Sequence, residues 1–309
     1  MTEPIYFIYN PHAGPGVKLT MGADWLWLEA AQSYARVATG REMVLVAAES
    51  FDSARKAARD AAARGAEIII GAGGDGTLRA LAEALAGTDS ALGIVPRGTV
   101  NVLARELNIP LGNVAEAMEI CLGGRTRRLD LGRIGDRYFL LMCSVGFDAT
   151  AVQAMQPAVK DLVGASAYVL SGVATLTAFV PPVFTLYLDG KLWFTGPCFM
   201  AVIANSPNYG GDFRFLPDAE MEDGLLDVAL FTVPPGGGLA LQRGAFLRQL
   251  GTAALGRAAA DPEVHLLRAR QIAIQTLPET PAQVDGDAFG ATPLVVEVAP
   301  KALKVLVPS

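Results

Sequence analysis

The sequence has few cysteines, histidines and charged residues, and these shortages exclude several classes of protein. Its three cysteines, Cys121, Cys143 and Cys198, are spaced too widely to predict a zinc site or a disulfide framework. We assign no role to the two histidines, His12 and His265. Charged residues make up 18% of the chain and the formal net charge is −6, which argues against nucleic acid as a partner.

A recognisable targeting segment is also missing. The first ten residues, MTEPIYFIYN, lack the basic start and the apolar core of a signal peptide, so we expect a cytoplasmic protein. The uncharged stretch at residues 162–188 approaches the length of a membrane helix. It is rich in small residues and ends its helical pattern at Pro181 and Pro182, which favours a buried or groove-lining helix over a membrane span.

The order of the predicted elements indicates two domains in the 309 residues. In residues 1–128, short apolar runs alternate with helical patterns, which predicts an α/β domain with parallel strands that gather ligands at their carboxyl ends. In residues 129–309, strands follow one another through two-residue Gly-Asp or Asp-Gly turns, which are typical of hairpins. The second domain is therefore predicted to be mostly antiparallel β.

Three glycine-bearing turns follow predicted strands of the first domain. They are NPHAGPG at residues 10–16, GAGGDGT at residues 71–77 and PRGTVN at residues 96–101. Glycine lets the backbone approach a ligand closely, and the amides at a following helix start attract phosphate. No G-K-S or G-K-T sequence occurs, so none of the turns is a Walker A motif. Together the three turns predict a nucleotide site.

Asp75 is the one acidic residue within the second glycine turn, and two roles are open to it. It can cap the helix expected to begin near Leu78, although Thr77 caps as well or better. It can also act in phosphate chemistry, because a carboxylate among phosphate-binding amides repels the anion unless Mg²⁺ intervenes or the carboxylate takes a proton. That electrostatic cost favours the functional role.

These residues resemble the diacylglycerol kinase catalytic family, which includes bacterial lipid kinases, sphingosine kinases and ceramide kinases. Beyond the glycine turns, the segments SVGFDA at 144–149, NSPNYGGDFRFLPDAEMEDGLLDV at 205–228 and VDGD at 284–287 follow in family order. The resemblance implies a doubly wound α/β nucleotide-binding domain, a β-sandwich-like domain and ATP bound between them. The last strand, about 301–309, is open to packing back on the first domain.

The resemblance also implies binding residues for ATP and Mg²⁺. The residues that would line the ATP phosphates are Asn10, Pro11, Gly14, Gly73, Gly74, Asp75, Gly76, Thr77, Gly98, Thr99 and Asn101. In the acidic stretch AEMEDGLLD, the family's structural Mg²⁺ loop would use the side chain of Asp223, with further contacts from Glu220 and from the carbonyl of Leu225. Oxygen ligands of this kind suit Mg²⁺.

Four positions depart from the family pattern. The general base falls on Asp287, where many bacterial members have Glu, and Asp285 beside it is the alternative base. One methylene less shortens the reach by about 1.5 Å. Val102 replaces an Asp that helps to organise metal-bound water, and Ala47 and Ala48 stand where members often have a Thr near the adenosine. A thinner metal network and altered nucleotide binding are the expected consequences.

The resulting functional prediction is an ATP-dependent lipid kinase that phosphorylates a primary hydroxyl of diacylglycerol or of a sphingolipid such as ceramide. It would act in phospholipid biosynthesis as a cytoplasmic enzyme in peripheral contact with the inner face of the membrane. Two alternatives stay open: a soluble-substrate kinase of the NAD kinase type, and a nucleotide- or lipid-binding module without catalysis. The sequence leaves open which lipid is phosphorylated, and whether the protein forms a homodimer.

Overall fold

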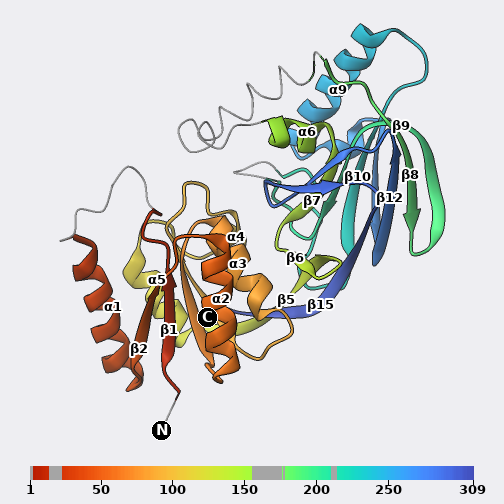
Figure 1. Ribbon diagram of the computed structural model, residues 1–309. Helices are drawn as coiled ribbons and strands as arrows, with labels where there is room; N and C mark the ends of the chain where they lie inside the picture. Colours follow the sequence, from red (N-terminus) through yellow and green to blue (C-terminus); the bar gives the residue numbers. More distant parts are fainter. Residues whose placement is uncertain (1–2, 14–22, 155–175, 177, 210–213) are drawn as a thin grey trace. The chain divides into compact units, whose positions relative to one another are not determined.

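A computed structural model describes residues 3–13, 23–154, 176, 178–209 and 214–309 (Figure 1). Contacts along the chain divide it into two compact units. Unit 1 comprises Met1–Asp130 and Lys301–Ser309, and unit 2 comprises Leu131–Pro300. Each unit has its own sheet architecture.

Unit 1 is built on a parallel sheet with helices around it (Figure 1). The strands lie in the order β2-β1-β3-β4, and the end of β15 pairs with β4. Their bounds are β1 Ile5–Tyr9, β2 Met43–Ala47, β3 Ile68–Gly73 and β4 Ala91–Pro96. The helices are α1 Ala23–Thr39, α2 Phe51–Ala63, α3 Asp75–Leu85, α4 Val102–Glu106 and α5 Val114–Gly123. This is the α/β architecture that the alternating pattern predicts.

Short apolar runs form these strands, and small residues at helical spacing form the helix faces that cover them. Ile69 and Ile70 in β3 are fully buried, as expected for a parallel strand covered on both faces. Helix α2 begins with a capping box, in which the Ser50 side chain accepts the N–H of Ser53. The buried residues of this helix are Ala54, Ala58 and Ala61. Packing of alanines lets the helix lie close to its neighbours.

The order of the strands reverses between β1 and β3. The chain passes from β1 to β2 on one side, whereas β3 pairs with the other side of β1. In open α/β sheets, ligands bind outside the carboxyl ends of the strands at such a point. Asn10 follows β1 and Gly74 follows β3, so this topology places two of the three glycine turns at the edge where a ligand is expected.

Unit 2 consists mainly of antiparallel strands in two sheets that share the long strand β9. The first half of β9 pairs with β8, and its second half pairs with β7 and β10. From β8 one sheet continues to β12 and the start of β15. The other continues from β7 to β13 and β14, and from β10 to β11. The bounds are β7 Met142–Gly146, β8 Val183–Leu188, β9 Lys191–Ala204, β10 Leu226–Thr232, β11 Val264–Ala269, β12 Gln271–Leu277, β13 Pro281–Val284, β14 Asp287–Ala291 and β15 Leu294–Val307.

One hydrophobic core lies between these two sheets. The first sheet contributes Phe184 and Ile272, and the second contributes Val145, Ile203 and Leu230, all of them buried. Two sheets with a shared core confirm the expected β-sandwich-like class. The short hairpin of β5 (Arg125–Ile134) and β6 (Arg137–Phe139) and the helices α6 (Phe147–Ala154) and α9 (Leu239–Ala254) complete the named elements.

Both predicted hairpins are present in the structure. Ile134 pairs with Arg137 across the Gly-Asp turn, and Leu188 pairs with Lys191 across the Asp-Gly turn. In the second turn Asp189 and Gly190 both have positive φ angles, which a type I′ turn requires. These short turns set the register of the neighbouring strands.

The described helices bear on whether the chain crosses a membrane. Within the described part of the chain, no helix combines the length and the hydrophobicity needed to cross a bilayer. Most of the apolar stretch at residues 162–188, where the sequence favours a buried or groove-lining helix, lies outside the described residues. Helix α1 is described, but the side chains of its first five residues, Trp25 and Trp27 among them, also lie outside the described residues.

Candidate active site

Hydrogen bonds between strand ends bring the three glycine turns together. The N–H of Asn10, after β1, donates to the carbonyl of Ala72 in β3 over 3.0 Å. The N–H of Arg97, after β4, donates to the carbonyl of Gly73 over 2.9 Å, and its Nε donates to the carbonyl of Ala13 over 3.4 Å. The predicted phosphate ligand Gly14 follows directly and lies outside the described residues.

The second and third turns pack backbone against backbone. A Cβ added to Gly98 would lie 2.5 Å from the Cα of Gly74, and one added to Gly73 would lie 2.5 Å from the Thr77 Oγ1. Neither position has room for a side chain. The glycines therefore serve to bring two turns into contact, while Gly76 and Thr99 stay exposed beside them.

Asn101 stabilises the third turn from within. Its Oδ1 accepts the N–H of Gly98 and its Nδ2 donates to the carbonyl of the same residue, both over 2.7 Å. Its own backbone is left-handed, with φ at 53°. This buried amide is thus used to shape the turn.

The Asp75 carboxylate has a structural contact that the sequence did not suggest. Helix α3 begins at Asp75 itself, and its N-cap residue is Gly74, which forms no side-chain cap. Instead the Asp75 Oδ1 accepts the N–H of Leu103 in α4 over 3.4 Å. Burial raises the pKa of Asp75, and backbone N–H groups of Leu103, Val102 and Asn101 oppose that rise by stabilising the charged form. Asp75 therefore links α3 to the start of α4.

The departure at Val102 alters the surroundings of this carboxylate. Val102 is the first residue of α4 and is 5% exposed, so an apolar side chain stands where the family often has a second acid. Ala47 ends β2 and Ala48 follows it, bonded through its N–H to the carbonyl of Tyr9. None of these three side chains can ligate a cation.

In unit 2, the two aspartates of VDGD occupy a tight hairpin turn. Val284 pairs with Asp287, and Asp285 and Gly286 between them both have positive φ angles. The Asp285 carboxylate accepts the N–H of Leu140 and Leu141 over 2.9 Å each, and that of Met142 over 3.0 Å. Asp285 therefore anchors the turn to the chain before β7, whereas the half-buried Asp287 opens β14.

A polar group that sequence reasoning missed lies next to this turn. The buried Gln283 precedes it in β13 and hydrogen-bonds to Ser144 and Asp148, and Tyr209 also donates to Asp148. Ser144 and Asp148 belong to the SVGFDA segment and Tyr209 to the NSPNYGG segment. The shared segments were visible in the sequence, but the contacts among them were not.

An arginine of a neighbouring strand pairs with the acidic loop predicted to hold Mg²⁺. Arg268 of β11 forms ion pairs with Asp223 and, over 3.1 Å through its Nε, with Asp227. The other Asp223 oxygen accepts the N–H of Leu225 over 3.0 Å. Glu220 is exposed, and the described residues contain no cluster of three acidic, histidine or cysteine side chains suited to a metal. Within the residues that the structure describes, this loop does not fit a Mg²⁺ ion.

Burial shapes the acid that faces this arginine. Asp227 is 6% exposed, and burial raises its pKa. The charge of Arg268 opposes that rise, whereas the neighbouring charges of Asp223 and Asp218 add to it. The guanidinium therefore compensates several carboxylates at once, as a bound cation would.

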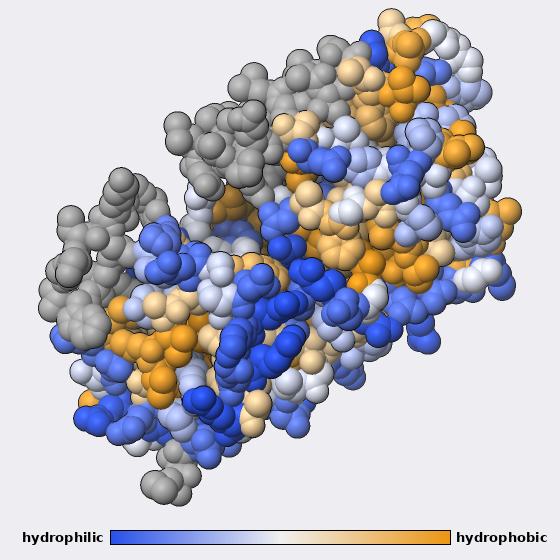
Figure 2. All heavy atoms as spheres, in the orientation of Figure 1, coloured by the Kyte–Doolittle hydropathy of each residue, from blue (hydrophilic) through white to orange (hydrophobic). Residues whose placement is uncertain are grey.

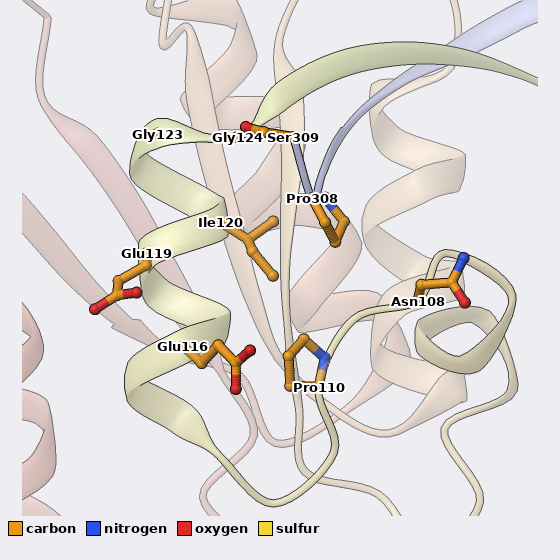
Figure 3. A pocket seen from close by; sticks show the side chains of 9 residues that line it. All are labelled: Asn108, Pro110, Glu116, Glu119, Ile120, Gly123, Gly124, Pro308 and Ser309. Carbon is orange, nitrogen blue, oxygen red and sulfur yellow. The ribbon is translucent and has the colours of Figure 1, made fainter.

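A cavity of 390 Å³ in unit 1 is separate from the glycine turns (Figure 3). The loop after α4, one face of α5 and the residues after β15 line it. Glu116 and Glu119 are its charged side chains, and no Lys or Arg lines it. An acidic lining repels phosphate, so this cavity is not a candidate for the nucleotide.

Family models match both units of the chain. Residues 4–134 match the diacylglycerol kinase catalytic domain, and residues 142–307 match the YegS C-terminal NAD kinase beta sandwich-like domain. The matched ranges include the three glycine turns in the first model and the VDGD turn in the second.

Individual proteins resemble nearly the whole chain. A protein named diacylglycerol kinase from Mycobacterium tuberculosis (strain CDC 1551 / Oshkosh) is 31% identical over 274 residues, 87% of this chain and 86% of that protein. Its namesake from Bacillus subtilis (strain 168) is 27% identical over 93% of this chain and 90% of its own. A crystal structure titled as a diacylglycerol kinase from Bacillus anthracis str. Sterne superposes with a TM-score of 0.76 at 22% identity, covering 99% of this chain and 97% of that one.

The contacts of Asp285 predict a measurable loss of stability on substitution. Asp285→Asn keeps the size of the side chain but replaces one accepting oxygen with an N–H₂ group, which leaves a backbone N–H without its acceptor. We expect the free energy of unfolding to fall by about 1–3 kcal/mol in urea denaturation. Asp136→Asn, in the exposed Gly-Asp turn of the same unit, is the matched control and should change it by less than about 0.5 kcal/mol. Equal losses in the two variants would show that the three contacts do not stabilise the fold.

The ion pairs of Arg268 predict a fold that does not need a divalent cation at the acidic loop. Adding EDTA or Mg²⁺ should leave the melting temperature of the nucleotide-free protein unchanged. Arg268→Gln should lower it by about 2–4 °C, since the buried Asp227 loses its cation. A melting temperature of the unaltered protein that falls in EDTA and recovers with Mg²⁺ would contradict this assignment.

Proposed function

Because the chain belongs to the diacylglycerol kinase family and is therefore a lipid kinase, we propose that it transfers the γ-phosphoryl group of ATP to a primary hydroxyl of a membrane lipid. Diacylglycerol is the first acceptor to test, since the relatives in M. tuberculosis and B. subtilis carry that name. A sphingolipid such as ceramide offers the same hydroxyl chemistry and is the second.

The observation that supports this function best is the contact between Gly74 and Gly98 at the carboxyl edge of the parallel sheet. Gly76 and Thr99, each near one of these glycines in the sequence, are exposed, and a backbone hydrogen bond joins Asn10 to the same edge. Backbone N–H groups at such an edge bind phosphate without a side chain. We assign the phosphates of ATP to this surface, with Mg²⁺ entering as part of the nucleotide substrate.

The chemical step needs little covalent work from the protein. The lipid hydroxyl oxygen forms a bond to the γ-phosphorus as the bond to the β-γ bridging oxygen breaks, and ADP leaves. Asp287 is assigned to take the hydroxyl proton. Asp285 is the weaker candidate because its carboxylate already accepts three backbone N–H groups. Asp75 supplies negative charge beside the phosphate surface, where the cation that accompanies ATP compensates it.

The first prediction of this function concerns the acceptor. Purified protein with labelled ATP and Mg²⁺ should phosphorylate diacylglycerol in mixed vesicles, with ceramide and NAD assayed in parallel. Asp287→Asn should lower kcat about 100-fold or more, as expected for loss of a general base. If only NAD becomes labelled, the proposed lipid acceptor is wrong and a soluble-substrate kinase takes its place. ATP binding without turnover on any lipid would support the binding-module alternative.

Asp75→Asn provides a second variant for the same assay. Asparagine still accepts the N–H of Leu103 through its Oδ1, so α4 keeps its contact while the charge is lost. The variant should fold normally by circular dichroism and lose at least about 100-fold in kcat. Wild-type turnover in this variant would leave Asp75 with its structural role alone.

A lipid acceptor implies that the protein meets a bilayer, and helix α9 is the surface that we assign to this contact. Four large apolar side chains of α9 and its C-terminal end are exposed: Leu239 49%, Leu241 71%, Leu247 56% and Leu255 75%. Hydrophobic residues gather at the surface over α9, at the top of the view (Figure 2). Exposed leucines on one helix suit the interfacial region of a membrane.

The charges near α9 favour the same partner. Residues 228–260 contain three arginines and no Asp or Glu, although the whole chain has a formal net charge of −6. One of the arginines, Arg248, pairs with Asp261, and the other two are Arg243 and Arg257. A segment with exposed leucines and three arginines, but with no Asp or Glu of its own, suits a bilayer with anionic headgroups.

The second prediction of this function separates membrane contact from chemistry. Leu247→Glu combined with Leu255→Glu should lower binding to phosphatidylglycerol-containing vesicles about tenfold or more in sedimentation assays. Turnover of a dispersed short-chain diacylglycerol should stay within about twofold, because neither leucine touches the proposed site. Leu277→Glu, at a leucine 77% exposed elsewhere in unit 2, is the matched control. Equal vesicle binding by all variants would exclude α9 as the membrane surface.

A further inference from the structure

Gln283 is a buried amide that lies between the VDGD turn and an aspartate. It is 1% exposed. Its Oε1 accepts the N–H of Gly286 over 2.8 Å, and its Nε2 donates to the Ser144 Oγ over 2.8 Å and to the Asp148 Oδ2 over 3.3 Å. Only the Oε1 can accept and only the Nε2 can donate, so an acid on one side and an N–H on the other allow a single orientation of this amide.

Asp148, at the start of α6, is fixed from several sides. Its Oδ2 accepts the hydroxyls of Ser144 and Tyr209 over 2.5 Å each, and its Oδ1 accepts the N–H of Ala149 over 2.8 Å. The ring of Tyr209 stacks on Phe215 with 4.2 Å between centroids. The carboxylate that orients Gln283 is therefore itself held by donors of its own SVGFDA segment and by Tyr209 of the NSPNYGG segment.

We infer that Asp148 and Gln283 are positioning residues for the catalytic turn: Asp148 orients the amide of Gln283, and Gln283 holds the N–H of Gly286, one residue before Asp287. This inference rests on the proposed function, since it takes Asp287 as the proton acceptor.

Two anchors then act on the same two-residue turn. Asp285 binds the N–H groups of residues 140–142 on one side, and Gln283 binds Gly286 on the other. A turn held at both central residues leaves few positions for the next side chain. Catalytic groups displaced by about 1 Å can lose about 100-fold in rate, which makes this restraint consequential.

Gln283→Glu tests the inference through the pH dependence of turnover. The new carboxyl group still accepts the N–H of Gly286. It can donate a hydrogen bond to Asp148, as the Gln283 Nε2 does, only when it is protonated. The titratable groups around it are Asp148 on α6, Tyr209 after β9, Cys143 on the facing strand β7, and Asp285 in the turn. Burial and the charge of Asp148 should raise the pKa of the new carboxyl above its ordinary value of about 4.3.

The direction of the pH effect follows from that rise. While the new carboxyl is protonated, its O–H replaces the lost donor, and kcat should approach that of the unaltered protein. As pH increases through the raised pKa, two carboxylates repel each other and kcat should fall about tenfold or more by about pH 8. The KM values for ATP and lipid should change by less than about twofold, because neither Gln283 nor Asp148 is assigned to substrate.

A compensating second substitution gives the sharper test. In the double variant Asp148→Asn with Gln283→Glu, the new Asn donates from its Nδ2 to the new carboxylate, which restores the pair with donor and acceptor exchanged. We expect the double variant to recover kcat at about pH 8 to within threefold of the unaltered protein. A residue that served only the stability of the fold would not recover turnover by such an exchange.

Gln271→Glu is the matched control. Gln271 donates from its Nε2 to the Glu297 Oε1 over 2.8 Å in the same unit, so the same substitution creates the same pair of carboxylates away from the VDGD turn. Its pH profile should follow that of the unaltered protein.

The outcomes separate this inference from the proposed function. If Gln283→Glu keeps the unaltered pH profile, or if the double variant fails to recover while both variants remain folded, the positioning role is overturned. If Asp287→Asn keeps full turnover, the assignment of the base is overturned, whatever the Gln283 variants show.

Discussion

The candidate residues of each unit depend on the same kind of interaction, an aspartate carboxylate that accepts backbone N–H groups. In unit 1 the Asp75 carboxylate binds the start of α4 and thereby links the second glycine turn to the third. In unit 2 the Asp285 carboxylate binds three consecutive N–H groups before β7 and fixes the VDGD turn. A carboxylate satisfied by several donors holds a turn without a hydrophobic core around it, which suits loops that must stay open to a ligand.

This interaction separates roles that look alike in the sequence. Asp285 and Asp287 are two residues apart, yet the positive φ of Asp285 and Gly286 reverses the chain between them. Asp285 is turned toward the backbone before β7, whereas Asp287 begins a new strand. The same kind of side chain thus serves as an anchor at one position and is available for chemistry at the other, and the type of turn decides which.

Local patterns made much of the fold predictable. The alternation of strands and helices up to residue 128 and the two-residue hairpin turns follow from interactions between near neighbours. The meeting of the glycine turns follows from the parallel sheet that this alternation predicts. The contacts that shape the site are long-range. Gln283 lies 135 residues from Asp148, and Arg268 lies 45 residues from Asp223, so their pairing depends on which strands become neighbours. No spacing rule predicts that an arginine of β11 meets the acidic loop, or that Asp75 binds α4.

The departure from the family pattern at position 287 is connected with the geometry of unit 2. An Asp in place of Glu at position 287 has a shorter reach and fewer rotatable bonds, so the position of its carboxylate follows that of the backbone more closely. In the proposed mechanism, a shorter base therefore gains more from a rigid turn than a longer one does. The hydrogen bonds of Asp285 and of Gly286 hold both central residues of this turn in place. Gln283 can accept the N–H of Gly286 because its hydrogen bond to Asp148 fixes the orientation of its amide. In the proposed mechanism, the hydrogen bonds around Asp148 therefore compensate for the shorter side chain at position 287 by fixing the backbone of the turn.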